Sequence, residues 1–187
     1  MRLDPKLTVT FLLLPLLLAA CSSTPTATMD FDPGFDFTGV SKIAIKPVDR
    51  TISSTAVVSD MQVNRINQTL SEELDRRGYQ VVADQAEADL LLAWHLVTQE
   101  RTDIRSYNSS VRYNNCWHCR PSTPDIRVRH YTQGTFIADM VDPAAGQSVW
   151  RSIFESRLRD QPDPQRAEEN RREAAQAVFK EFPPDDG

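Results

Sequence analysis

The sequence predicts an α+β domain with a mainly antiparallel sheet of about five strands and two helices packed on one face of it. Residues 59–78 and 163–182 repeat apolar residues at helical spacing. Five other segments alternate apolar and polar residues or are continuously apolar, as strands are. The predicted order is β-α-β-β-β-β-α, and this grouping of strands apart from helices is typical of an α+β fold.

The amino terminus has the parts of a secretory signal peptide. Arg2 and Lys6 make its start positively charged, residues 7–18 are mostly apolar, and two alanines precede Cys21. The apolar segment is too short to span a bilayer. We therefore expect residues 1–20 to be removed as a signal peptide.

Leu-Ala-Ala-Cys at positions 18–21 resembles the lipobox of bacterial lipoproteins. The resemblance implies that Cys21 becomes the first residue of the mature protein and carries acyl chains such as palmitate. A plain secreted protein with a chance cysteine is the alternative. Ser22 and Ser23 follow the cysteine, in place of the Asp that favours retention in the inner membrane. The resemblance therefore implies an outer-membrane lipid anchor, with the protein facing the periplasm.

Without residues 1–20 the chain has 167 residues, enough for one domain with a sizeable core. The full chain has a formal net charge of −5 and the signal peptide one of +1, so the mature chain carries −6. This acidic balance argues against a nucleic-acid partner. We expect residues 21–36, rich in Ser, Thr, Pro and Asp, to form a flexible tether. Residues 37–187 would then form a single periplasmic α+β domain.

The first predicted strand, residues 41–48, alternates Ile43 and Ile45 with polar neighbours and ends near Pro47. Ser59 and Gln62 form the pattern of a capping box at the start of the first helix. Gly78 follows the helix, where a left-handed residue is favoured. The apolar stripe of this helix, which we assign to core packing, consists of Val63, Ile66, Leu70 and Leu74.

Residues 79–83 form a short predicted strand, and residues 89–97 are apolar on both faces, as in a central strand covered on both sides. His95 lies in this strand, and we expect a hydrogen-bonded core histidine there rather than a ligand or a base. Residues 128–141 and 148–156 form a predicted hairpin around an Asp-Pro-Ala-Ala-Gly turn.

The last predicted helix begins at Asp163, with Pro164 in its first position. Its small-residue face predicts close packing against the rest of the domain. The residues of that face are Ala167, Ala174, Ala177, Val178 and Phe182.

Several short motifs together resemble the family of Gram-negative lipoproteins catalogued as domain of unknown function 4136. The resemblance implies one periplasmic domain with no established catalytic activity. It also implies structural roles for Gly78 as a helix cap, Gly134 at a crowded position and Trp150 in the core. The motifs are Gly78-Tyr79, Ala88-Asp89-Leu90-Leu91, Gly134-Thr135-Phe136 with Asp139 and Asp142, Trp150, and Phe182-Pro183-Pro184.

Cys116 and Cys119, in the sequence Cys-Trp-His-Cys, have three interpretations. In an oxidising envelope two thiols this close favour a disulfide, which is our prediction. Thiol–disulfide exchange needs a helix that starts at the first cysteine, but two prolines follow the motif. A zinc site needs four ligands, and His118 with His130 would have to complete it without a second Cys-x-x-Cys motif. We therefore predict no metal site.

Residues 101–127 are predicted to form a long Arg-rich loop. Residues 101–130 contain six arginines and two aspartates, a net charge of +4, which leaves −10 for the rest of the mature chain. Such a loop suits an anionic envelope partner, and its interleaved aromatic and amide residues suit protein or glycan contacts. A solvated loop whose aromatic residues fold back onto the sheet is the alternative. The candidate contact residues are Arg105, Tyr107, Arg112, Tyr113, Trp117 and Arg120.

Apart from Cys116 and Cys119, the sequence offers little for a conventional enzyme. It has no Gly-x-Ser-x-Gly elbow, no His-Glu-x-x-His motif and no phosphate-binding glycine loop. We expect no catalytic residues, no cofactor and no enzyme activity. The predicted function is a lipid-anchored binding or scaffolding domain whose partner is an envelope protein, a glycan or an anionic lipid. The alternative is a thiol-dependent redox or metal-binding envelope protein that uses Cys116 and Cys119.

Overall fold

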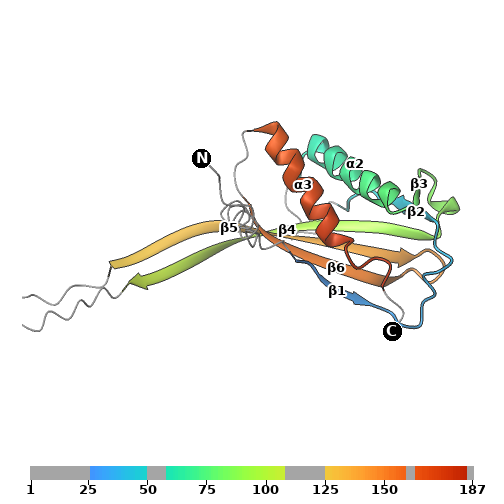
Figure 1. Ribbon diagram of the computed structural model, residues 1–187, viewed down its shortest axis with the longest axis horizontal. Helices are drawn as coiled ribbons and strands as arrows, with labels where there is room; N and C mark the ends of the chain where they lie inside the picture. Colours follow the sequence, from blue (N-terminus) through green and yellow to red (C-terminus); the bar gives the residue numbers. More distant parts are fainter. Residues whose placement is uncertain (1–25, 50–57, 108–124, 159–162, 185–187) are drawn as a thin grey trace, which may run out of the picture.

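Six strands form one sheet in the order β1-β6-β5-β4-β2-β3, and two helices cover one of its faces (Figure 1). The computed structural model describes residues 26–49, 58–107, 125–158 and 163–184. The strands are β1 (Thr28–Phe31), β2 (Lys42–Ile45), β3 (Gln80–Val82), β4 (Leu90–Tyr107), β5 (Asp125–Asp142) and β6 (Gln147–Leu158). The helices are α2 (Asp60–Arg76) and α3 (Pro164–Val178), with a short 3-10 helix, η2 (Gln85–Glu87).

The predicted α+β class is confirmed, with one more strand than expected. Strands β4, β5, β6 and β1 pair antiparallel in succession. At the other side of the sheet, β2 lies between β3 and β4 and runs parallel to both. A parallel pair needs a crossover connection, and α2 supplies it between β2 and β3.

The additional strand is β1, which lies inside the segment predicted as a tether. Its residues pair with β6 from Thr28 opposite Ile153 to Phe31 opposite Trp150. Met29 and Phe31 alternate with polar residues and pack against the core. Four residues of apolar–polar alternation are a weak signal in the sequence. The segment becomes a strand because it pairs with β6. The ordered domain therefore begins before residue 37.

Both helix starts agree with the sequence. The Ser59 hydroxyl accepts a hydrogen bond from the Gln62 backbone N–H at 3.3 Å, and the Gln62 side-chain oxygen accepts one from the Ser59 N–H at 3.0 Å. Asp163 accepts a hydrogen bond from the Gln165 N–H at 3.0 Å. These caps satisfy backbone donors that the first turn of a helix leaves unpaired.

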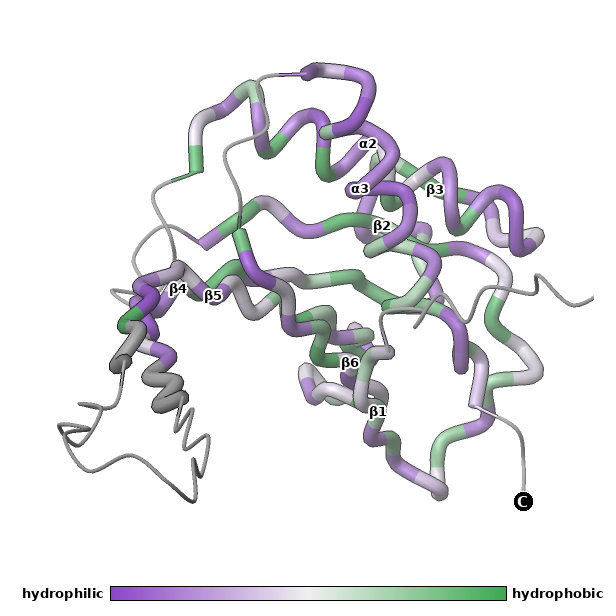
Figure 2. The backbone as a smooth tube through the Cα atoms, turned by 60° about the vertical axis from the view of Figure 1, so that its left-hand side comes forward, coloured by the Kyte–Doolittle hydropathy of each residue, from purple (hydrophilic) through white to green (hydrophobic). Residues whose placement is uncertain are grey.

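The main core lies between the helices and the sheet. In Figure 2 apolar residues recur along α2 and α3 and gather in the strands beneath them. Trp150 stacks on Phe179 of the last turn, with ring centroids 5.9 Å apart. Trp94 of β4 stacks on Phe136 of β5 at 5.5 Å. The first pair joins the end of α3 to the sheet, and the second packs two neighbouring strands against each other.

The opposite face of the sheet is covered less than the sequence predicts. A second small cluster, Ala44, Ala88 and Leu91, lies there at the end near η2. Farther along β4, Ala93, His95 and Val97 are half-buried. His95 lies opposite Ile137, and its Nδ1 atom is buried without a hydrogen-bond partner in the described part of the chain. The predicted hydrogen bond of His95 is therefore wrong for Nδ1, because the cross-strand neighbour Ile137 is apolar.

Candidate functional site

Strands β4 and β5 continue past the end of β6 as a two-stranded ribbon. The last pair between β5 and β6 is Thr132 with Leu158, whereas β4 and β5 stay paired from Arg101 opposite Tyr131 to Tyr107 opposite Asp125. We call residues 101–107 and 125–131 the β4–β5 ribbon. At about 3.4 Å per residue this part is about 20 Å long. Figure 1 shows that it projects from one end of the molecule, beyond the helices.

The ribbon corrects the prediction of a loop over residues 101–127. Strand pairing takes up residues 101–107 and 125–127 at the two ends of that segment. The apolar alternation that marks a half-buried strand is missing here, and the described side chains of the ribbon, at residues 101–103 and 128–131, are exposed or half-buried. Val128, for example, is 50% exposed. Sequence periodicity reveals a strand only where one of its faces is buried. The pairing of β4 with β5 in the ribbon buries little, so the sequence pattern did not reveal it.

The ribbon places some of the predicted contact residues at its far end. Arg105 and Tyr107 lie among the last residue pairs of the ribbon, opposite Arg127 and Asp125 respectively. The ribbon thereby brings the two ends of segment 108–124 together. The other four candidate contact residues, which lie outside the described residues, are Arg112, Tyr113, Trp117 and Arg120.

The three cysteines also lie outside the described residues. Lipidation at Cys21 and the pairing of Cys116 with Cys119 therefore stay predictions, as does the thiol-dependent alternative. His130, which the sequence offered as a metal ligand, lies with its Nδ1 atom 3.1 Å from the Thr102 hydroxyl across the ribbon. Within the described ranges no group of three or more His, Cys, Asp and Glu residues could hold a metal ion. Nor does any helix there have the length and apolarity to cross a membrane.

The base of the ribbon is held by a group of polar contacts with the end of β6. The guanidinium of Arg157 lies over the Tyr131 ring, 4.1 Å from its centroid, and 3.8 Å from a carboxylate oxygen of Asp103. Gln133 donates a hydrogen bond to Glu155 at 2.7 Å. A cation over an aromatic ring is attracted by about 0.5–1 kcal/mol at an exposed site. These contacts tie the ribbon to the sheet where β6 ends.

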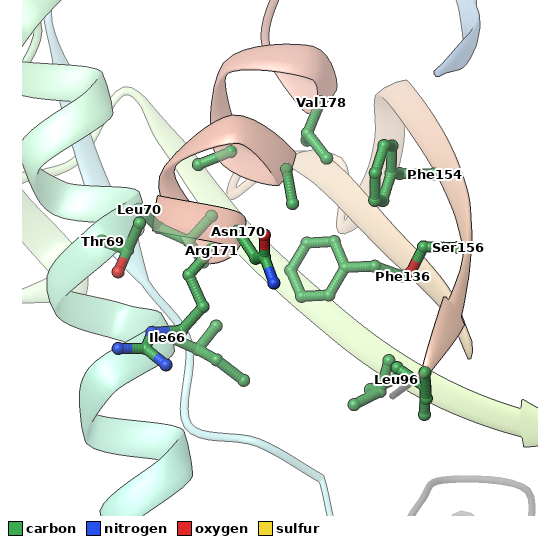
Figure 3. A pocket seen from close by; sticks show the side chains of 13 residues that line it. Ile66, Thr69, Leu70, Leu96, Phe136, Phe154, Ser156, Asn170, Arg171 and Val178 are labelled. Carbon is green, nitrogen blue, oxygen red and sulfur yellow. The ribbon is translucent and has the colours of Figure 1, made fainter. Parts of the chain in front are cut away.

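A second feature, which the sequence did not predict, is a pocket of about 220 Å³ between the helices and the sheet (Figure 3). Its lining comes from both helices and three strands. The lining residues are Ile66, Thr69, Leu70, Leu96, Phe136, Phe154, Ser156, Leu158, Asn170, Arg171, Ala174, Ala175 and Val178. The small-residue face of α3 was predicted to pack closely, but Ala174 lines this space. That face was the only sequence signal for the pocket.

The motifs that carried the family resemblance have structural roles. Gly78 has φ of 91° after α2, and Trp150 is 1% exposed. A Cβ atom at Gly134 would lie 2.8 Å from a methyl carbon of Leu158, which is closer than real contacts. The predicted roles of these three residues are confirmed.

The two aspartates of the hairpin motif are structural as well. Asp139 is 5% exposed and accepts hydrogen bonds from Arg151 Nε at 2.7 Å and from the Ser148 hydroxyl at 2.8 Å. The hydrogen bond to Asp139 raises the pKa of Arg151 further above its ordinary range. Asp142 accepts a hydrogen bond from the Ala144 N–H at 2.8 Å, which closes the turn after β5. Both carboxylates are therefore engaged in holding the β5–β6 hairpin.

Solved structures with a similar arrangement have low sequence identity to this chain. A DUF4136 family protein from Bacteroides thetaiotaomicron is 15% identical, with a TM-score of 0.44 over 85% of this chain and 94% of that one. A PDZ domain protein from Parabacteroides distasonis is 16% identical, with a TM-score of 0.49 over 86% of this chain, which spans 37% of that protein's length. A minor lipoprotein from Acinetobacter baumannii is 9% identical, with a TM-score of 0.34 over 76% of this chain and 91% of that one. Likenesses this low carry no argument about function.

Family membership comes from the sequence itself. No curated protein matches it. The family model described as Domain of unknown function (DUF4136) matches residues 27–184. That range begins next to β1 and ends after α3, so it contains every strand and helix of the described fold. The chain belongs to the DUF4136 family.

Proposed function

We propose that this protein is a non-catalytic binding or scaffolding domain, anchored by lipid on Cys21, that contacts an anionic envelope partner through the far end of the β4–β5 ribbon. The observation that carries the proposal is the ribbon itself, which stays paired for seven residues of each strand beyond the end of β6. A two-stranded ribbon is marginally stable in water by itself. Extending the ribbon orders residues without adding to the core. We therefore infer that the ribbon serves to hold its far end away from the sheet.

The charge distribution supports an anionic partner. The segment 101–130 carries a net charge of +4 on a chain that is otherwise acidic. Charges of one sign gathered on a projection attract an oppositely charged partner and raise the rate of encounter. Arg105 lies near the far end of the ribbon, and Arg112 and Arg120 belong to the segment that connects its strands.

The proposed anchor limits how far the domain can move from the membrane. Cys21 and Thr28, the first residue of β1, are seven residues apart. Seven extended residues span at most about 25 Å. The sheet would therefore stay close to the lipid surface, and the ribbon would provide the additional reach. The predicted outer-membrane location, facing the periplasm, belongs to this proposal.

Site-specific photo-crosslinking with the complete lipidated protein tests the proposed contact. A photoreactive amino acid replaces Tyr107 at the far end of the ribbon or, as the control, exposed Gln176 on α3. We expect a defined adduct from position 107 and none from position 176. Replacing Arg105, Arg112 and Arg120 by Gln should reduce the adduct several-fold. Equal adducts from both positions, or an adduct that these replacements leave unchanged, would contradict the proposal.

A further inference from the structure

We propose that the pocket beneath α2 and α3 binds the alkyl chain of a medium-chain fatty acid, with Arg171 facing its carboxylate. This site is separate from the ribbon and does not depend on the ribbon's role.

The floor of the pocket is apolar and held in place. Leu96, Phe136 and Phe154, from β4, β5 and β6, form it. Phe136 stacks on Trp94, and the Trp94 indole N–H donates a hydrogen bond to the Asn67 side-chain oxygen at 2.8 Å. Because these groups already have their partners, a ligand does not have to reorganise the floor. Binding to a pre-formed apolar site avoids an ordering cost.

The walls come from the two helices. Ile66 and Leu70 of α2 face Ala174, Ala175 and Val178 of α3 across the pocket. The alanines on α3 leave the space open, since a longer side chain at either position would fill it. The apolar walls suit a hydrocarbon and do not suit a sugar, whose hydroxyl groups would lose their hydrogen bonds there.

The volume sets the length of the hydrocarbon. A buried apolar cavity of about 150 Å³ holds benzene, which has six heavy atoms. By this scale 220 Å³ holds roughly nine heavy atoms. One chain of about eight carbons fits, whereas the two long chains of a membrane lipid do not. Asn170 and Leu158 are the exposed members of the lining, so the pocket reaches the surface at these residues.

The charge at the pocket selects an acid. Arg171 is the one charged residue among the described lining residues, so no carboxylate there opposes an anion. Its side chain is half-buried, and its Nε atom is buried without a hydrogen-bond partner in the described ranges. Figure 3 shows the side chain extending from α3 beside Ile66 of α2. An unpaired buried donor is unfavourable, and a carboxylate would supply the acceptor that it lacks.

The neighbouring arginine offers a matched control. Arg172 pairs with Glu168 on the surface of α3, and it is not part of the lining. Removing its charge therefore changes the net charge of α3 as Arg171→Gln does, without changing the pocket. Ala174→Leu fills the pocket from the helix, and Ser156→Leu fills it from the sheet.

The test uses the complete lipidated protein in lipid nanodiscs with an octanoate analogue that carries a photoreactive diazirine on its last carbons. We expect labelling of peptides from β4, β5, β6 and α3, and competition by unlabelled octanoate. Octan-1-ol and hexadecanoate should compete at least tenfold less well. Ala174→Leu and Ser156→Leu should each abolish labelling, Arg171→Gln should weaken it about tenfold, and Arg172→Gln should leave it unchanged.

Thermal unfolding of each variant shows which of them fold, and either filling variant is sufficient. Labelling that persists in a folded filling variant, or that falls outside the lining elements, would overturn the assignment of the pocket. Equal competition by octan-1-ol, or an equal effect of Arg171→Gln and Arg172→Gln, would overturn the role of Arg171 and the choice of an acid.

Discussion

At the scale of single residues, the buried carboxylate of Asp139 holds the β5–β6 hairpin together. It receives two hydrogen bonds from the Arg151 guanidinium, at 2.7 and 3.1 Å, and one from Ser148. The register between the strands shifts beside it, between Met140 and Val141. A carboxylate at this point supplies acceptors to side chains that the irregular pairing brings together.

Replacing Asp139 by Ala should lower the free energy of unfolding by about 2 kcal/mol, because it leaves Ser148 and Arg151 without their acceptor. Half of the Arg151 side chain is exposed to water, which keeps the loss below that for a fully buried pair. Urea unfolding measures the difference. Glu169→Ala, at an exposed position of α3, is the control and should change the free energy by less than about 0.5 kcal/mol. Equal losses for the two variants would show that Asp139 has no structural role.

Asp89 should make the stability depend on acidic pH. Its carboxylate accepts hydrogen bonds from the backbone N–H groups of Ser41 and Lys42 at 2.9 and 2.8 Å, and these lower its pKa below the ordinary 3.8. A lowered pKa in the folded state stabilises the protein above the ordinary pKa, and this contribution disappears as the pH falls through the folded value. Asp89→Asn should therefore be less stable than the wild type near neutral pH.

The difference between the wild type and Asp89→Asn should shrink as the pH is lowered below about 4. Denaturant unfolding of both proteins across this range measures it. A difference that stays constant with pH would mean that the charge on Asp89 does not contribute.

At the scale of elements, the ribbon depends on contacts at its base. Tyr131 and Asp103 meet Arg157 where β6 ends, and farther out the strands have only each other as partners in the described sheet. Local openings of a structure follow the places with few buried contacts. The ribbon should therefore open more readily than the sheet from which it extends.

Arg157→Ala should speed the exchange of backbone amide hydrogens in residues 101–107 and 128–131 several-fold. The replacement removes the contacts of Arg157 with Tyr131 and Asp103, which hold the base of the ribbon to the end of β6. Exchange in the core of β4, around Leu92 and Trp94, should stay as it is in the wild type. Hydrogen-exchange mass spectrometry reports both regions in one measurement. A uniform change across β4 would contradict a local role for Arg157.

The elements also show which parts of a fold can be predicted from one sequence. Helix α2 was predictable because its cap, from Ser59 to Gln62, and its end at Gly78 are local signals. Strand β1 and the outer half of β4 were not, because long-range pairing defines them and little burial marks them in the sequence. The parallel placement of β2 between β3 and β4 is likewise a property of the assembled sheet.

The candidate sites show the same division. Arg105 and Tyr107 could be selected from the composition of their segment, although the sequence placed them in a loop and not on a paired ribbon. The pocket could not be selected, because it forms only where α2, α3 and three strands meet. Each lining residue, such as Phe154 or Val178, is by itself an ordinary core residue in the sequence.

At the scale of the whole molecule, the ribbon and the helix-covered sheet are separable parts. All pairing of β5 with β6 lies between Thr132 and Asp142, so the sheet does not need the ribbon. Glu100 and Thr132 are cross-strand partners. Two residues, Asn-Gly, can therefore join them in a tight hairpin turn that replaces residues 101–131. We expect the full-length chain with this replacement to keep the helices, the core and the pocket.

Capture from the cell envelope with this shortened chain tests the proposed role of the ribbon most directly. The full-length wild type and the shortened chain are purified from envelopes at the same salt concentration, and their bound molecules are compared by mass spectrometry. Circular dichroism confirms that both are folded. We predict that the wild type retains a defined anionic partner and that the shortened chain, folded and anchored, does not. Equal retention of the partner by both chains would contradict the proposal that the ribbon makes the contact with it.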